Sequence, residues 1–132
     1  MRNEELRENE IKSKSTAFAK RIVSAYQYLS RERKEFILSK QLLRCGTSIG
    51  ANVTEAQYAS SRKDFLYKLY IALRECAETL YWLEILASGG YLTDAEYRSL
   101  YSDGEELRRI LASITKTVRE RTPLAEQSED NS

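Results

Sequence analysis

The scarcity of turn-forming residues constrains this chain more than any other feature, because its 132 residues include only one proline and five glycines. β-Sandwiches and barrels need such residues about every 8–12 positions. Helices need far fewer, and the 42% hydrophobic and 31% charged residues suffice for a buried core beneath a charged surface. A chain of this length fits one domain. The sequence therefore predicts a single all-helical domain.

Apolar residues recur at spacings of three and four in four segments, which predicts helices over about 14–30, 35–58, 62–88 and 94–122. Ser61 with Asp64, and Thr93 with Glu96, have the spacing of helix N-terminal caps. Short connections make consecutive helices antiparallel. We therefore expect an all-α, up-down-up-down antiparallel four-helix bundle over residues 13–123. Residues 1–12 would form a polar N-terminal extension, and residues 124–132 an acidic, disordered tail.

The sequence lacks the residues and motifs that several kinds of catalytic, redox and metal-binding chemistry require. The sequence has no histidine, and its two cysteines, Cys45 and Cys76, lack the C-x-x-C spacing of redox and metal sites. Neither a nucleophile with a neighbouring base nor a cofactor motif is found. No run approaches 18 apolar residues, and the N-terminus lacks the basic start and apolar run of a signal peptide. We expect a cytoplasmic protein that is not an enzyme, holds no cofactor and has no membrane partner.

Gly46 and Gly50 lie four residues apart in the second predicted helix, where glycine is unfavourable. A phosphate loop is excluded because Gly-Lys-Ser/Thr never follows these glycines. We interpret them as small residues that let a neighbouring helix approach closely, in preference to a ligand site.

Polar residues also follow helical spacing on the second and third predicted helices, which places them in two facing ladders. Buried charges need partners, so we interpret the set as a structural network within or between subunits. The alternative is a di-metal site at the carboxylates, but such sites use Glu-x-x-His pairs and this chain has no histidine. The predicted network comprises Arg44, Ser48, Asn52, Glu55, Arg74, Glu75 and Glu78.

The third predicted helix carries a second apolar stripe beside its core-facing one. A helix that is apolar on more than one side is buried on more than one side, which favours an interface with another subunit. The aromatic members could instead stack nucleic-acid bases. The predicted interface residues are Tyr67, Tyr70, Ile71, Tyr81, Trp82 and Ile85.

Basic residues cluster where an antiparallel bundle would bring its helix ends together. The starts of the first and third helices and the end of the fourth share one end of such a bundle, and that end would attract phosphates. The alternative is that these residues only form a solvent-exposed charged face, which is the more common role of a run of charges. The predicted nucleic-acid-binding residues are Lys14, Lys20, Arg21, Arg62, Lys63, Lys116, Arg119 and Arg121.

Two sequence blocks resemble a bacterial family of four-helix bundle proteins, the 23S rRNA intervening-sequence proteins. The first runs from Gln41-Leu42-Leu43-Arg44 through Thr47-Ser48-Ile49-Gly50-Ala51-Asn52-Val53-Thr54-Glu55-Ala56. The second is Ile71-Ala72-Leu73-Arg74-Glu75-Cys76-Ala77-Glu78-Thr79-Leu80-Tyr81-Trp82-Leu83, and the resemblance covers residues 36–114.

The resemblance implies a ring-like homopentamer without enzymatic activity. The architecture is also similar to that of the accessory variability determinant, which partners the reverse transcriptase of diversity-generating retroelements and contacts nucleic acid. A ring would repeat the basic patch and make weak phosphate contacts avid. The favoured hypothesis is an oligomeric RNA- or DNA-binding accessory protein that partners a reverse transcriptase. The alternative is a protein-interaction scaffold with no direct nucleic-acid role.

Overall fold

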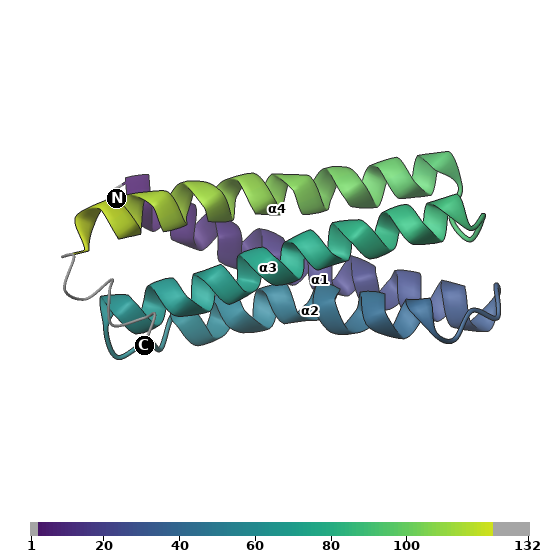
Figure 1. Ribbon diagram of the computed structural model, residues 1–132, viewed down its shortest axis with the longest axis horizontal. Coiled ribbons are helices and arrows are strands. Elements are labelled where there is room, and N and C mark those ends of the chain that lie inside the picture. Colours follow the sequence, from purple (N-terminus) through teal and green to yellow (C-terminus); the bar gives the residue numbers. More distant parts are fainter. Residues whose placement is uncertain (1–2, 123–132) are drawn as a thin grey trace.

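The computed structural model describes residues 3–122 and contains four helices. They are α1 (Asn3–Arg31), α2 (Leu38–Ala56), α3 (Arg62–Ser88) and α4 (Asp94–Arg121). Figure 1 shows them side by side with alternating directions, and α4 packs against both α3 and α1 to close the bundle. No strand occurs in the described range. The predicted up-down-up-down four-helix bundle is confirmed, while the ring-like assembly stays a prediction.

The core runs the length of the bundle and takes residues from every helix. Ile22, Leu42, Leu83 and Leu111 come from the four helices in turn and are fully buried. They lie in one apolar cluster, which supplies most of the driving force for helix association. Among residues 3–122, no helix is long and apolar enough to cross a membrane.

The glycines of α2 lie where α1 comes closest. A Cβ atom on Gly46 would meet Cγ2 of Ile22 at 2.8 Å, and one on Gly50 would meet the Ser15 carbonyl oxygen at 3.2 Å. Real Cβ atoms essentially never come as close as 2.8 Å, and a contact at 3.2 Å would require α1 to shift by a few tenths of an ångström. The interpretation of Gly46 and Gly50 as a close-approach surface is confirmed.

Helix termini follow the predicted capping chemistry on α3 and α4. Ser61 Oγ accepts from Asp64 N at 3.0 Å, and Thr93 and Glu96 exchange the two hydrogen bonds of a capping box. Gly90 has φ +82° after the end of α3, a conformation that favours glycine. These ends therefore have local causes that can be read from the sequence.

The start of α1 differs from the sequence prediction. The helix begins at Asn3 instead of near Lys14, and Ile11 is 1% exposed within the core. Leu6 and Ile11 are the only apolar residues between positions 3 and 12, so periodicity gives no signal there. Residues 3–12 belong to the bundle and do not form the predicted extension. The predicted acidic tail, 124–132, lies outside the described residues.

Candidate nucleic-acid interface

One end of the bundle gathers the first turns of α1, the connection between α2 and α3, the first turn of α3 and the last turns of α4 (Figure 1, left). We call it the N/C end. Arg62 Nη1 donates to the carbonyl oxygen of Arg121 at 3.0 Å, which joins the start of α3 to the end of α4. The basic residues that the structure brings to this end, as predicted, are Arg62, Lys63, Lys116, Arg119 and Arg121.

The other three predicted basic residues lie elsewhere. Lys14 Nζ pairs with Glu106 at 3.1 Å and with Glu10 at 3.5 Å, while Arg21 Nη1 pairs with Asp103 at 2.5 Å. Arg21 also donates from Nη2 to Ser99 Oγ at 2.9 Å. These contacts place both residues on the side of the bundle between α1 and α4.

The displacement follows from the early start of α1. At a rise of about 1.5 Å per residue, the eleven extra residues move Lys14, Lys20 and Arg21 roughly 16 Å further from the helix start than predicted. Their assignment to the basic end was therefore wrong. The hydrogen bond of Lys14 to Glu106 raises the pKa of the Lys14 ammonium. Burial lowers that pKa, but its effect is smaller.

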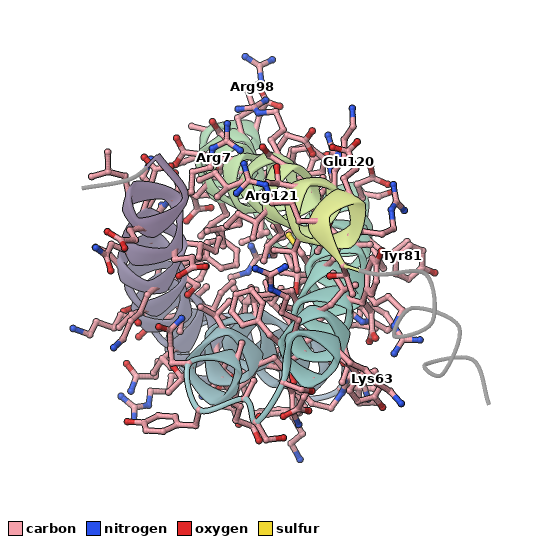
Figure 2. All side chains as sticks on the ribbon, turned by 90° about the vertical axis from the view of Figure 1, so that its left-hand side faces the viewer. Arg7, Lys63, Tyr81, Arg98, Glu120 and Arg121 are labelled. Atoms are coloured by element: carbon pink, nitrogen blue, oxygen red, sulfur yellow. The ribbon has the colours of Figure 1, made fainter. Side chains whose placement is uncertain are left out.

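Arg7 occupies the place on α1 that was predicted for those three residues. Its Nη1 donates to Ser113 Oγ at 2.8 Å, which ties the start of α1 to α4. Figure 2 looks onto the N/C end and shows Arg7 and Arg121 there. Nothing in the apolar pattern marks Arg7, so only a correct helix start would have identified it.

A hollow of about 210 Å³ lies at the same end, between α1, α3 and α4. Its lining combines two arginines, a carboxylate, a ring and an aliphatic side chain, namely Arg62, Arg121, Glu8, Phe65 and Val118. Burial, and secondarily the charge of Glu5, raise the pKa of the Glu8 carboxyl above its ordinary value. Within residues 3–122, Glu8 makes neither an ion pair nor a hydrogen bond, although arginines line the same hollow.

Tyr58 projects from the connection between α2 and α3 with 85% of its surface exposed. The turn that carries it is wound by backbone hydrogen bonds, including Tyr58 N to the Glu55 oxygen at 3.0 Å and Ala59 N to the Ala56 oxygen at 3.1 Å. The ring therefore sits on an ordered turn, four residues before Arg62. Tyr58 belongs to no helical stripe, so the sequence pattern does not mark it.

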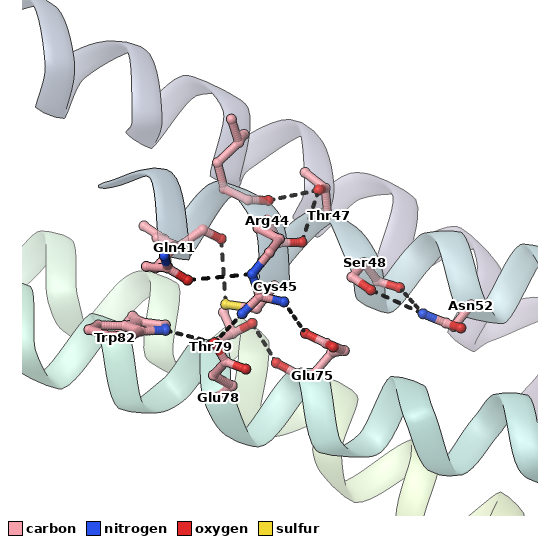
Figure 3. A network of polar contacts seen from close by, with 12 residues as sticks. Gln41, Arg44, Cys45, Thr47, Ser48, Asn52, Glu75, Glu78, Thr79 and Trp82 are labelled. Atoms are coloured by element: carbon pink, nitrogen blue, oxygen red, sulfur yellow. Dashed lines mark hydrogen bonds and ion pairs between the residues drawn. The ribbon is translucent and has the colours of Figure 1, made fainter. Parts of the chain in front are cut away.

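The predicted polar network has two separate parts, one that joins α2 to α3 and one within α2. Arg44 pairs with Glu75 at 3.3 Å and with Glu78, and Trp82 Nε1 donates to Glu78 Oε2 at 3.0 Å (Figure 3). Asn52 Nδ2 donates to the backbone oxygen of Ser48 at 2.9 Å and to its Oγ at 3.0 Å.

The remaining two predicted members stand apart from both groups. Glu55 pairs with Lys68 at 3.8 Å, and Arg74 is exposed and makes no ion pair within the described range. Among the same residues, no three histidine, cysteine or acidic side chains lie close enough to hold a metal ion. The structure thus shows an Arg44-centred cluster and a separate Ser48–Asn52 pair in place of two continuous facing ladders.

The second apolar stripe of α3 lies on the outside of the monomer. Tyr67 and Tyr81 are 50% and 52% exposed. Tyr70, Ile71, Trp82 and Ile85 are half-buried, and the Tyr81 and Trp82 rings meet edge-on at 5.0 Å between centroids. The stripe therefore leaves the aromatic side chains of Tyr67 and Tyr81 half exposed on the monomer surface.

The fold and its buried core define the chain as a small antiparallel four-helix bundle. It belongs to the 23S rRNA-intervening sequence protein family, whose model matches residues 7–113. The family resemblance predicted from residues 36–114 is confirmed.

One solved structure gives a detailed comparison. A protein of unknown function from the S23 ribosomal protein family of Bacteroides thetaiotaomicron VPI-5482 superposes with a TM-score of 0.83 at 52% sequence identity. The match covers 83% of this chain and 98% of that chain. No curated protein matches the sequence.

Proposed function

We propose that the protein is a non-enzymatic accessory protein that assembles with copies of itself and binds RNA or DNA at the N/C end. The contact between Arg62 and the Arg121 carbonyl carries the proposal, because it unites basic residues more than fifty positions apart on one surface. Arg7 adds a further cation from α1. Such a cluster suits phosphates, whose contacts dominate affinity for nucleic acids.

Self-association would multiply these contacts. The exposed stripe of α3 supports an interface between subunits, and each added subunit would present another N/C end to the same strand. Five subunits and a reverse transcriptase as protein partner rest on the resemblance described above, and a cytoplasmic location rests on the residue patterns of the sequence. They are part of the proposal.

Binding to labelled single-stranded RNA, single-stranded DNA and duplex DNA, measured by fluorescence anisotropy between 50 and 200 mM salt, tests the nucleic-acid role. Replacing Lys116, Arg119 and Arg121 together by Gln should weaken binding at least tenfold and flatten the salt dependence, because about three phosphate contacts are lost. The matched control replaces Arg31, Lys34 and Lys40 by Gln at the opposite end, where the loss should be much smaller. Equal losses in both triple variants would refute the assignment to the N/C end.

The assembly is tested separately by light scattering. Ile71→Glu places a carboxylate in the proposed interface and should dissociate the oligomer, because an unpaired charge is costly to bury. Ile37→Glu is the control, since Ile37 is 75% exposed and lies outside the α3 stripe. A monomeric wild type would contradict self-association. A protein that assembles but binds no nucleic acid at 50 mM salt would favour the scaffold alternative.

A further inference from the structure

We propose that the hollow at the N/C end receives one unpaired guanine base of a bound strand, with the neighbouring phosphate held by Arg62 and Arg121. The proposal rests on the nucleic-acid role proposed above and assigns the ligand class of that site. A base can enter only if it is unpaired, so the preferred ligand is a single strand or a loop.

The hollow offers a separate group for each part of a nucleotide. Arg62 and Arg121 line it with guanidinium donors, whose fork geometry suits phosphate oxygens. Phe65 presents part of its ring, and aromatic rings stack on unpaired bases. Val118 completes the apolar part of the lining.

Glu8 determines which base fits. An ionised carboxylate accepts hydrogen bonds and donates none. The Watson–Crick edge of guanine presents N1–H and an N2 amino group side by side, so both carboxylate oxygens can be used. Uracil presents a single N–H between two carbonyl oxygens, which a carboxylate repels.

The lack of hydrogen-bond partners for Glu8 in the free protein also favours guanine. It lines a hollow that also contains two arginines, yet within residues 3–122 it forms no ion pair and no hydrogen bond. Partly buried carboxylates are normally paired, because an unsatisfied charge costs free energy. A donor-rich base edge would supply the missing partners and relieve that cost on binding.

The hollow is also placed to work together with Tyr58. Tyr58 precedes Arg62 by four positions, so their Cα atoms lie within about 14 Å of each other. A strand whose guanine occupies the hollow can stack an adjacent base on the exposed Tyr58 ring. The two aromatic side chains thus provide successive contacts for one strand.

The test uses fluorescein-labelled U12 RNA and the same 12-mer with one central guanosine, at 50 mM salt. The wild type should bind the guanosine oligomer about tenfold more tightly, since a good bidentate pair discriminates by roughly that factor or more. Inosine at the central position lacks only the N2 amino group and should lose part of this preference.

Glu8→Gln should reduce the preference for guanosine to less than about threefold, because an amide cannot offer two acceptors. Glu120→Gln is the matched control: it removes the same charge near the end of α4 but lies outside the lining of the hollow. Both variants should bind U12 slightly more tightly than wild type, and only Glu8→Gln should lose discrimination. Circular dichroism checks that both fold.

The outcomes separate the two proposals. A wild type that binds neither oligomer at 50 mM salt refutes the nucleic-acid role itself. A wild type that binds both with equal affinity, or a Glu8→Gln variant that keeps the preference, overturns the guanine assignment and leaves the broader role standing.

Discussion

The two ends of the bundle use their charged residues differently. At the far end, Arg33 donates from Nη1 to the Tyr91 oxygen and from Nη2 to the Gly90 oxygen, both at 3.0 Å, and lies 5.4 Å from the centre of the Tyr91 ring. At the N/C end, a carboxylate and two arginines line the same hollow, and Glu8 makes no ion pair among the residues described. The Arg33 charge at the far end joins two loops, while the Glu8 carboxylate at the N/C end faces a space without such a contact among the residues described.

Glu35 gives the clearest case of a charge used for folding. Its carboxylate is buried and accepts from the backbone N–H groups of Ile37, Leu38 and Ser39 at 3.1, 2.9 and 2.7 Å. These are the otherwise unpaired N–H groups at the start of α2. Glu35 and Glu8 together teach that a carboxylate alone does not mark a binding end, because the fold satisfies Glu35 and gives Glu8 no hydrogen bond within residues 3–122.

The largest change in the free energy of unfolding is expected for a substitution of Glu35. Glu35→Ala should lower the free energy of unfolding by about 1–2 kcal/mol, because three backbone donors lose their acceptor near the protein interior. Urea denaturation monitored by circular dichroism measures the change. Glu32→Ala, at an exposed position in the same connection, should stay within about 0.5 kcal/mol of wild type. Similar losses in both variants would contradict the role of Glu35 as a cap.

The cap also has a pH signature. Burial alone would raise the pKa of the Glu35 carboxyl, but hydrogen bonds from Leu38, Ser39 and Ile37 outweigh burial and lower it below the usual 4.5. The contribution to stability is therefore complete above that value and is lost as pH falls through the folded pKa. Wild type and Glu35→Gln should differ most near neutral pH and converge at acidic pH. Curves that remain parallel down to pH 3 would argue against the hydrogen-bonded carboxylate.

The sequence predicts the parts of this fold that have local causes. The bounds of α3 and α4 follow from the Ser61 cap, the Thr93–Glu96 capping box and the turn at Gly90, and all three appear in the structure. The start of α1 could not be predicted this way, because the burial of Ile11 depends on helices distant in sequence. Tertiary packing, not local pattern, extends α1 to Asn3.

That single error explains most of what was missed at the candidate site. Lys20 and Arg21 were assigned to the N/C end because α1 was expected to begin near Lys14, and Arg7 and Glu8 were left in an extension. The remaining basic residues were placed correctly because the bounds of α3 and α4 were correct. The hollow itself arises from three helices meeting, so no property of one segment predicts it.

A smaller effect is expected at Arg33. Arg33→Ala removes two hydrogen bonds to carbonyl oxygens and should cost about 0.5–1 kcal/mol, since the side chain is exposed and water partly replaces the lost donor. Arg33→Lys should recover little, because one ammonium group cannot reproduce the two-pronged contact. Thermal unfolding measures the loss of stability in each Arg33 variant. The control is Arg31→Ala, which changes an exposed neighbouring residue. A fully rescued lysine variant would show that charge alone matters there.

The smallest change in the free energy of unfolding is expected for a substitution of Glu8, and its sign should be opposite to that at Glu35. Its folded pKa lies above the usual 4.5, so the ionised carboxylate is less favourable in the folded chain than in the unfolded one, and it lowers stability above the folded pKa. Glu8→Gln should therefore raise the free energy of unfolding at pH 7 by a few tenths of a kcal/mol, because the position is only partly buried. Below the usual pKa, the carboxyl is protonated in both states and the gain should vanish.

Glu120→Gln, which removes the same charge from α4 outside the lining of the hollow, is the control for the change in net charge. A gain for Glu8→Gln at pH 7, beside a loss for Glu35→Ala, would show that a carboxylate stabilises the far end and strains the N/C end. A loss at Glu8 would instead mean that the fold already satisfies this carboxylate. The two ends would then be alike, and the hollow would have no unpaired acceptor to offer a base.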